Sequence, residues 1–229
     1  MECLDNALVW ARDLEKSYGR TTALHGVTVG AGEREVLAVT GPHGSGKSTL
    51  LHCLAAIVAA DAGEVWYGGT PVHTLAERAR RALRREHFGL ILQGTRLVPE
   101  LSAEENVALP LLLRGVRRGS ALADAREWLE RLEATHCSRR LPGSLSAVES
   151  QCVAAARALA GRPAVLFAEE PTATLDTAEA EHHMRMLTSV VRSQSIALVV
   201  TTEDARLGSH ADRVLAARDG RLEPARVPA

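Results

Sequence analysis

The sequence predicts an α/β fold: a parallel sheet at the core, a small antiparallel β layer before it, and a helical subdomain inserted into it. Short apolar segments alternate with helical patterns in residues 1–93 and again in 161–220, which is typical of parallel strands connected by helices. Residues 94–160 between them carry helical patterns only. At 229 residues we expect one domain, ending in a frayed tail at 221–229.

The first 93 residues should form the antiparallel layer and the first core strands. Residues 7–14 and 22–29 are predicted strands because apolar and polar residues partly alternate, and Tyr18, Gly19 and Arg20 form the turn between them. The other elements expected here are a buried strand at 36–40, a helix at 50–59, a strand at 63–67, a helix at 74–85 and a strand at 88–92. Helix 74–85 carries five arginines. A solvated face explains them most simply, with contact to a partner or to lipid head groups as the alternative.

Helices dominate the middle of the chain. Ser102 and Glu105 form the pattern of a capping box before a helix that carries residues 107–113. A second helix follows Ser120 and is predicted to run until Pro142 and Gly143 break it. The remaining expected elements are a helix at 147–160, a strand at 164–168, a helix at 177–192, and strands at 196–201 and 214–217.

Composition excludes several kinds of partner. The net charge is −1, the pI is near 6.8 and aromatic residues make up 3%, so no nucleic-acid partner is expected. No apolar run is long enough to span a membrane, and residues 1–5 lack the features of a signal peptide. We expect a cytoplasmic protein that reaches the membrane through a partner. The cysteines form no C-x-x-C pair, which indicates a reducing compartment and no zinc site: Cys3, Cys53, Cys137 and Cys152.

Residues 41–49 fit the pattern G-x-x-x-x-G-K-[ST] at every fixed position, which predicts a P-loop NTPase core. The loop consists of Gly41, Pro42, His43, Gly44, Ser45, Gly46, Lys47, Ser48 and Thr49. A predicted strand precedes it and a predicted helix follows, so backbone N–H groups and the helix dipole would converge on a phosphate. Lys47 would reach the β- and γ-phosphates of the nucleotide, and the Ser48 hydroxyl would bind Mg²⁺. An ordinary glycine-rich turn is the alternative, and this context disfavours it.

A second chemical site follows the apolar strand at 164–168. Glu169 and Glu170 stand where that strand ends, and ligands bind at the carboxyl ends of parallel strands in open α/β sheets. Beside a phosphate loop, Glu169 would lie near Mg²⁺ and Glu170 would act as the base that orients attacking water. Taken alone, two glutamates after a strand are equally well explained by a solvated loop.

Further motifs are spread along nearly the whole chain. They are Tyr18, Gln93, Leu145-Ser146 with residues 151–159, Glu170-Pro171-Thr172, Leu175-Asp176, residues 211–214 and residues 218–221. Together with the phosphate loop, they resemble the ABC-type ATPases, the nucleotide-binding subunits of membrane transporters. Residues 105–111 resemble those of the lipoprotein-releasing and macrolide-exporter subgroup of this family.

The resemblance implies an ATP site shared between two subunits, in which the phosphate loop of one meets the signature of the other. Tyr18 would stack on adenine, and Gln93 would sense Mg²⁺ and contact a membrane permease. The partners implied are that permease and a second nucleotide-binding subunit, which forms a homodimer or a heterodimer. The residues of this chain that would face the partner subunit are Ser146, Ala147, Val148, Glu149 and Asp176.

Several positions depart from the family pattern. Ala147 and Val148 stand where the signature has two glycines, and their side chains would crowd the approach to the γ-phosphate. Glu169 replaces an aspartate, which moves its carboxylate outward. Thr202 replaces a histidine that contacts the γ-phosphate, and a lost contact of this kind costs about 10²- to 10³-fold in rate. Lesser departures are Ala173 for glycine and Cys152 for arginine.

Two functions therefore remain open from the sequence. The chain either couples ATP binding and a weakened hydrolysis to a permease, or it is a catalytically poor ATP-binding subunit that regulates one. His43 is interpreted as a loop side chain near phosphate, not as a substitute for the missing histidine. A P-loop kinase or an unrelated GTPase would need an acceptor lid or a base-specific motif, and neither is visible.

Overall fold

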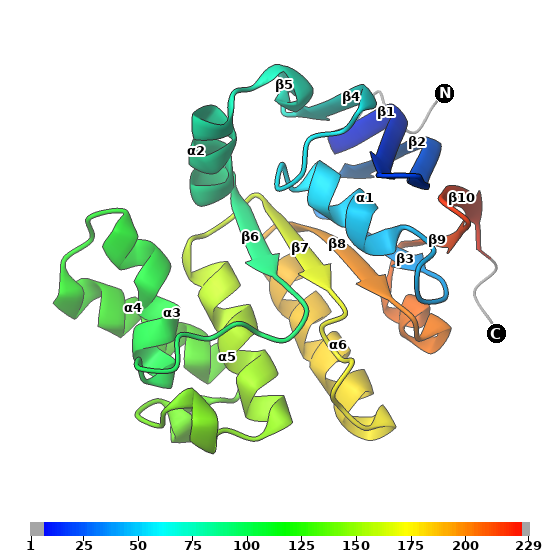
Figure 1. Cartoon of the computed structure of the whole chain (residues 1–229). Coiled ribbons are helices and arrows are strands. Elements are labelled where there is room, and N and C mark those ends of the chain that lie inside the picture. The colour runs from blue at the N-terminus through cyan, green and yellow to red at the C-terminus, as the bar shows by residue number, and fades with distance from the viewer. Residues whose placement is uncertain (1–6, 226–229) are drawn as a thin grey trace.

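The computed structural model describes residues 7–225 and contains two sheets (Figure 1). A six-stranded sheet has the order β10-β9-β3-β8-β7-β6, and a four-stranded sheet has the order β2-β1-β4-β5. The expectations for the amino terminus and Cys3, and for the tail beyond residue 225, lie outside the described residues. None of the helices within residues 7–225 is both long enough and apolar enough to cross a membrane.

The six-stranded sheet forms the core. Its central strand β3 (Val36–Thr40) is buried along its whole length and pairs in parallel with β8 (Ala197–Thr202) and β9 (Arg213–Arg218). Beyond β8, the strands β7 (Val165–Glu169) and β6 (Phe88–Ile91) continue the parallel pairing. Five strands therefore present their carboxyl ends at one edge of the sheet, as the sequence predicted.

The two faces of this sheet bury different partners. Along β3, Val36 and Ala38 pack into a cluster with the helical subdomain and α6 (Thr177–Ser193). Leu37 and Val39 face a second cluster, made with α1 (Lys47–Leu54) and the four-stranded sheet. Alternate residues of one strand thus hold the two halves of the molecule together, as the period of two requires.

The antiparallel layer consists of β1 (Ala7–Tyr18), β2 (Thr21–Gly32), β4 (Ala62–Tyr67) and β5 (Thr70–Pro71). The predicted strands and the turn between the first two are confirmed, although β1 and β2 extend further than expected. Trp10 on β1 and Trp66 on β4 lie opposite each other, and their rings stack with centroids 5.5 Å apart. Such cross-strand aromatic pairs stabilise a sheet.

The helical subdomain contains α3 (Ala103–Leu113), α4 (Arg118–Arg131) and α5 (Ala147–Ala160), which Figure 1 shows together beside the sheet. Ser102 and Glu105 form the predicted capping box of α3. The expectation that the second helix runs to Pro142 is wrong. It ends at Arg131, since Glu133 has a φ of 56°, and the short 3₁₀ turns Thr135–Cys137 and Pro142–Ser144 follow.

Three further expectations need correction. Helix α1 begins directly at Lys47 and stops at Leu54, well before residue 59, because Ala56 takes a left-handed φ of 57°. Helix α2 (Glu77–His87) begins later than predicted, since a 3₁₀ turn (Val72–Thr74) and an extended Leu75 precede it. The segment after Gly220 is not frayed at its start: β10 (Arg221–Pro224) pairs antiparallel with β9.

Candidate functional site

The phosphate loop joins the buried end of β3 to α1. Gly46 is the N-cap of α1 and has a φ of 97°. A Cβ added at Gly46 would lie 2.5 Å from the carbonyl oxygen of Ala23. A side chain on Gly41 would collide with the carbonyl of Ala217. The Ser45 hydroxyl is buried and has no hydrogen-bond partner within the described residues. The loop therefore forms a tight backbone cradle, with an open polar atom, at the helix N-terminus.

Lys47 lies buried beneath this cradle, only 5% exposed. Its ammonium group donates to the carbonyl oxygens of Gly41 at 2.8 Å and Pro42 at 2.9 Å. Nζ also lies 3.9 Å from a carboxylate oxygen of Glu170 and from one of Glu203. A cavity of about 190 Å³ is lined by the loop together with Gln93, Glu170 and Glu203. The loop thus borders this cavity with a cation and with the N-terminus of α1, which suits an anionic group.

Glu169 ends β7 directly beside the loop and is 6% exposed. Its carboxylate accepts hydrogen bonds from His52 Nε2 at 3.1 Å and from the backbone N–H of Gln93 at 3.4 Å. The pKa of Glu169 is lowered to about 2, mainly by the hydrogen bond from His52. A hydrogen bond from the Ser48 hydroxyl lowers the pKa further, whereas burial of the carboxyl group raises it. Glu169 is therefore held as a carboxylate.

The three predicted metal residues, Ser48, Gln93 and Glu169, are brought together by this geometry. An ionised carboxylate next to a hydroxyl is the oxygen donor set that Mg²⁺ prefers, so the residues present fit that ion. When bound beside a nucleotide, Mg²⁺ neutralises charge on the phosphates. His52 completes this group and was not anticipated from the sequence. Its position four residues after Ser48, on the same face of α1, is the signal that could have identified it.

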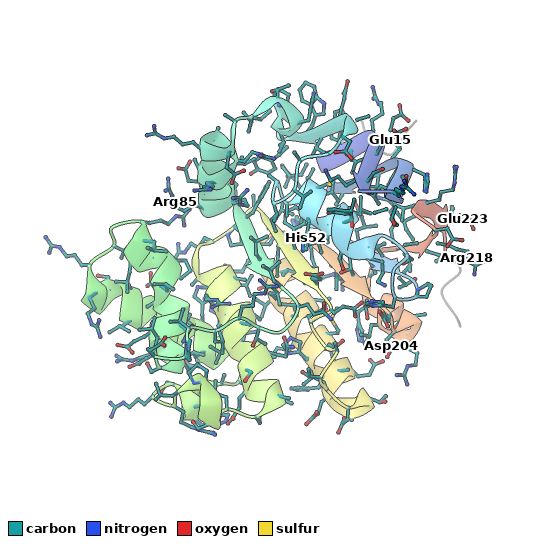
Figure 2. All side chains as sticks on the ribbon, in the orientation of Figure 1. Glu15, His52, Arg85, Asp204, Arg218 and Glu223 are labelled. Carbon is teal, nitrogen blue, oxygen red and sulfur yellow. The ribbon has the colours of Figure 1, made fainter. Side chains whose placement is uncertain are left out.

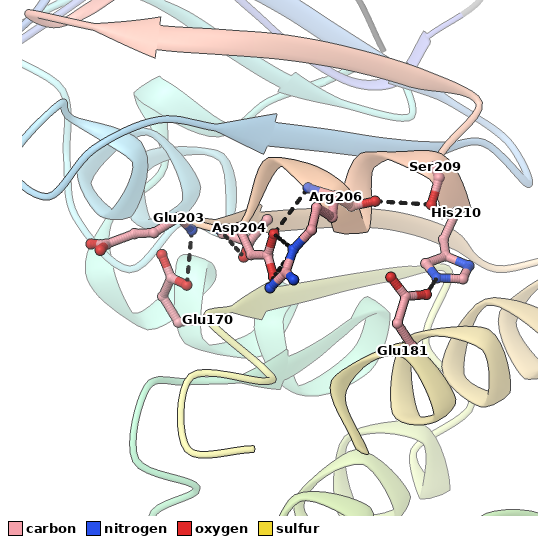
Figure 3. A network of polar contacts seen from close by, with 8 residues as sticks. Glu170, Glu181, Glu203, Asp204, Arg206, Ser209 and His210 are labelled. Carbon is pink, nitrogen blue, oxygen red and sulfur yellow. Dashed lines mark hydrogen bonds and ion pairs between the residues drawn. The ribbon is translucent and has the colours of Figure 1, made fainter. Parts of the chain in front are cut away.

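Glu170 lies in the next position but in a different environment. Its φ of 46° is rare for a residue with a side chain, and it turns the carboxylate toward β8. The carboxylate accepts a hydrogen bond from the backbone N–H of Glu203 at 3.2 Å (Figure 3). Burial raises the pKa of Glu170 above its ordinary value, while Lys47 and the Glu203 N–H oppose that rise. The pKa values of the two adjacent carboxyl groups are thereby shifted in opposite directions.

Thr202 ends β8 beside Glu170 and is 1% exposed. Its hydroxyl accepts a hydrogen bond from the backbone N–H of Asp204 at 3.1 Å, which stabilises the turn that follows β8. His43, at the loop tip, is exposed, and its Nδ1 lies 3.3 Å from a carboxylate oxygen of Glu203. A second cavity of about 420 Å³ opens here and is lined by His43, Gln93, Glu170, Thr202 and Asp176, among others.

A loop of this kind, followed by an acidic strand end, is compatible with several families of nucleotide-binding proteins. The family profile described as ABC transporter matches residues 24–173. The chain belongs to the ABC transporter family.

Similar proteins agree with this assignment. The lipoprotein-releasing system ATP-binding protein LolD 2 of Caulobacter vibrioides is 43% identical over 94% of this chain and 96% of its own length. LolD of Bordetella pertussis is 42% identical over 90% of this chain and 89% of its own. Among the members of the ABC transporter family, this chain therefore resembles the lipoprotein-releasing subgroup.

Solved structures of ABC cassettes match the fold. The ATP-binding cassette MJ0796, in a dimeric post-hydrolysis state bound to ADP and Pi, gives a TM-score of 0.89 at 30% identity and covers 96% of this chain and 99% of that one. CbiO1 of Clostridium perfringens, part of the ABC transporter complex cbiONQ, gives a TM-score of 0.87 at 24% identity and covers 96% of this chain and 88% of that one. At this identity the match supports the fold and nothing more.

The residues that resemble the family signature lie at the start of α5. Ser146 is the N-cap, and it forms a capping box with Glu149: the Ser146 hydroxyl accepts from the Glu149 N–H, and the Glu149 carboxylate accepts from the Ser146 N–H at 2.6 Å. The other carboxylate oxygen accepts from His136 at 2.9 Å and Arg140 at 2.7 Å. Both carboxylate oxygens of Glu149 are thus engaged, one by the N-terminus of its own helix and one by the segment that precedes it. Ala147 is exposed and Val148 half-buried in the first turn.

Some predicted residues stand apart from the phosphate loop within one chain. The residues lining the two cavities described above include none of Ser146, Ala147, Val148 and Glu149. Asp176 lines the larger cavity and caps α6 by accepting from the Glu179 N–H at 2.9 Å. Tyr18, at the end of β1, is 51% exposed, with Lys16 Nζ 5.5 Å from its ring centroid. Lys16 thus lies over one face of the ring, and the stacking role of Tyr18 stays a prediction.

Proposed function

We propose that this chain binds Mg-ATP at the interface of two nucleotide-binding subunits and drives a separate membrane permease, in export or extraction, with weakened hydrolysis. The observation that carries the proposal is the buried Lys47 beneath a backbone cradle, with Glu169 held ionised beside Ser48. Support for the transport role comes from the relatives, whose names place them in lipoprotein-releasing systems. The second subunit is a copy of this chain or a related one.

Weakened hydrolysis follows from the altered positions. Glu170 retains the placement and raised pKa of a base, so the acid–base machinery is partly present. Thr202 is buried, and its hydroxyl oxygen already accepts a hydrogen bond from the backbone N–H of Asp204. A threonine is also too short to replace a charged imidazole at a γ-phosphate. The side chains of Ala147 and Val148 add bulk where the family has glycines, at the face offered to the other subunit's nucleotide. Binding is thereby favoured over cleavage.

An apolar groove supports the permease as a partner. It has a volume of about 330 Å³ and runs between the start of β6 and the end of α3. Leu109, Pro110 and Leu113 line one side, and Phe88 and Leu90 line the other. Leu113 is 71% exposed and extends the apolar surface of this groove. We propose that a cytoplasmic segment of the permease occupies this groove, which would place the chain at the inner face of the membrane.

The alternative is a regulatory subunit that binds ATP and does not turn it over. The altered residues Ala147, Val148 and Thr202 are equally consistent with this alternative. The steady-state rate of ATP hydrolysis decides between the driving subunit and the regulatory subunit. We expect the purified chain to bind Mg-ATP, to associate on ATP addition and to release phosphate far more slowly than about 1 s⁻¹. A faster rate that Glu170→Gln abolishes would remove the claim of weakened hydrolysis. Absence of ATP binding would remove the proposal as a whole.

A further inference from the structure

Helix α2 carries five arginines, and none of its residues is buried. Like charges three and four residues apart repel one another and destabilise a helix. Two of the arginines hold the helix against the rest of the fold: the side chains of Arg80 and Arg84 are only 17% and 19% exposed. Arg84 also donates a hydrogen bond to the carbonyl oxygen of Ala56. Packing therefore accounts for two of the five arginines and leaves three to be explained.

The three remaining arginines share one face of α2. Arg78, Arg81 and Arg85 stand three and four residues apart, which places them in one row over about 10 Å of the helix. All three are exposed, and with Glu77 and Ala82 they line a concavity of about 530 Å³. Figure 2 shows Arg85 near the end of α2, at the outside of the molecule. We call these three residues the arginine row.

The acids of α2 do not neutralise the arginine row. Glu77 is shared by three arginines of the helix, at N–O distances of 2.8 to 3.2 Å. Glu86 pairs with Arg85 at 3.3 Å, and both side chains are more than half exposed, so water weakens this ion pair. Residues 77–87 carry five arginines against two glutamates, whereas the net charge of the whole chain is −1. The positive charge is therefore a local property of this helix.

The arginine row is continuous with the apolar groove between β6 and α3. Arg85 lines both the concavity and the groove, and Arg84 and Arg157 add two further cations to the lining of the groove. A permease segment in that groove would emerge from a membrane whose cytoplasmic leaflet carries anionic lipids. The arginine row beside the groove would then lie next to the phosphates of those lipids.

We propose that the arginine row binds the anionic head groups of the membrane surface. The orientation of the chain rests on the proposed function, whereas the lipid contact goes beyond it. None of the large apolar side chains that are exposed within residues 7–225 belongs to α2. The contact is therefore electrostatic, without insertion of the helix into the bilayer, and salt weakens it.

Vesicle flotation of the full chain without nucleotide tests this contact. Vesicles of phosphatidylcholine are compared with vesicles in which phosphatidylglycerol replaces about one third of that lipid, which gives them a negative surface potential. At low ionic strength the partition coefficient should be at least about tenfold higher for the anionic vesicles, because each arginine near such a surface contributes about fivefold. Rising salt should remove the difference.

Two triple variants of the arginine row separate charge from other effects. Arg78→Ala with Arg81→Ala and Arg85→Ala should lower partitioning into anionic vesicles by at least about tenfold. Alanine favours the helix and relieves the repulsion between arginines, so the variant should fold, and thermal unfolding checks this. The corresponding triple lysine variant retains the charge and should bind within about threefold of wild type.

The matched control removes three exposed arginines elsewhere, so it changes the net charge by the same amount. It combines Arg20→Ala, Arg218→Ala and Arg221→Ala. Figure 2 shows Arg218 on the other side of the molecule from Arg85. Because these charges lie away from the proposed contact, partitioning should stay within about twofold of wild type.

Three results would overturn the proposal. The first is equal partitioning of wild type into neutral and anionic vesicles, and the second is binding that salt does not weaken. The third is an equal loss in the control and in the alanine variant of the arginine row, which would mean that net charge alone attracts the chain. Failure of the proposed function has a different signature, since wild-type protein would then not bind ATP while its binding to vesicles remained.

Discussion

The ammonium group of Lys47 and the carboxylate of Glu170 face each other across the phosphate loop, with Nζ 3.9 Å from Oε1. The cation and the acid come from α1 and from the end of β7, two elements that only the parallel sheet brings together. Meanwhile Nζ donates to the loop carbonyls of Gly41 and Pro42. A bound phosphate would compete for these donors, and the lysine would exchange its carbonyl partners for charged oxygens.

Replacing this lysine should therefore weaken nucleotide binding. For Lys47→Ala we expect the ATP dissociation constant to rise by at least about tenfold, since charge-assisted hydrogen bonds to phosphate are lost. Equilibrium binding of a fluorescent ATP analogue measures this. Arg117→Ala, at an exposed arginine outside the lining of the loop cavity, should bind as wild type does. Equal loss of affinity in both variants would contradict the role given to Lys47.

Restoring the family residues should restore turnover. The triple variant Ala147→Gly, Val148→Gly and Thr202→His is expected to raise the steady-state rate of phosphate release by about tenfold or more, because it returns contacts that act in the transition state. The rates of the triple variant and of wild type are compared at saturating ATP, so that a difference in ATP affinity does not affect them. Adding Glu170→Gln to the triple variant should abolish the gain. A triple variant as slow as wild type would show that these positions do not limit hydrolysis.

The acid sensitivity of the fold should depend on His183, a buried residue of α6. Burial lowers the pKa of His183 to about 4, Nδ1 lies 3.9 Å from the Cys152 sulfur, and Nε2 has no partner within the described residues. Between about pH 6.5 and 4 the unfolded chain binds a proton here that the folded chain does not bind. Stability therefore falls as pH falls through this window.

The change His183→Leu removes this proton linkage. At pH 5 the wild type should have lost about 2 kcal/mol relative to pH 7 from this group alone, following about 1.4 kcal/mol per pH unit below 6.5. The variant should lose about 2 kcal/mol less over the same interval, as measured by urea unfolding without nucleotide. His25→Leu, at an exposed histidine of β2, should retain the wild-type pH dependence. Parallel pH curves for wild type and His183→Leu would contradict this account.

The apolar groove can be tested separately from the nucleotide site. Leu113→Asp places a charge on an exposed surface, so it should leave folding and ATP binding unchanged. It should reduce recovery of membrane proteins with the tagged chain by about tenfold when the complex is purified from native membranes. Leu141→Asp, at another exposed leucine, is the matched control. Equal recovery with Leu113→Asp and wild type would exclude the groove as the permease site.

The sequence predicted best what depends on local patterns. The phosphate loop, the capping box at Ser102 and the buried core strands each carry their signal within a few residues. Helix α1 ended early because Ala56 adopts a left-handed conformation that no residue preference announces. Strand β10 was missed because its pairing with β9 compensates for a polar, proline-containing sequence.

The candidate site was predicted in its parts but not in its contacts. Lys47, Ser48, Glu169 and Glu170 were identified from motifs, and the structure brings them together around the loop. His52 escaped notice because histidine on an apolar helix has no distinctive pattern until the neighbouring strand is placed. The roles of residues 146–149 stay predictions, since they concern a surface offered to another subunit.

The arrangement of the tryptophans has a practical consequence. The chain contains three of them, and the stacked Trp10 and Trp66 lie in the antiparallel layer, whereas Trp128 lies in α4 with Arg131 over its ring. The molecule therefore carries separate optical reporters on two of its parts. Coupling between the stacked indoles should appear in near-ultraviolet circular dichroism, and it would disappear when the β layer melts. Fluorescence of Trp128 would then reveal whether the helical subdomain loosens in the same step.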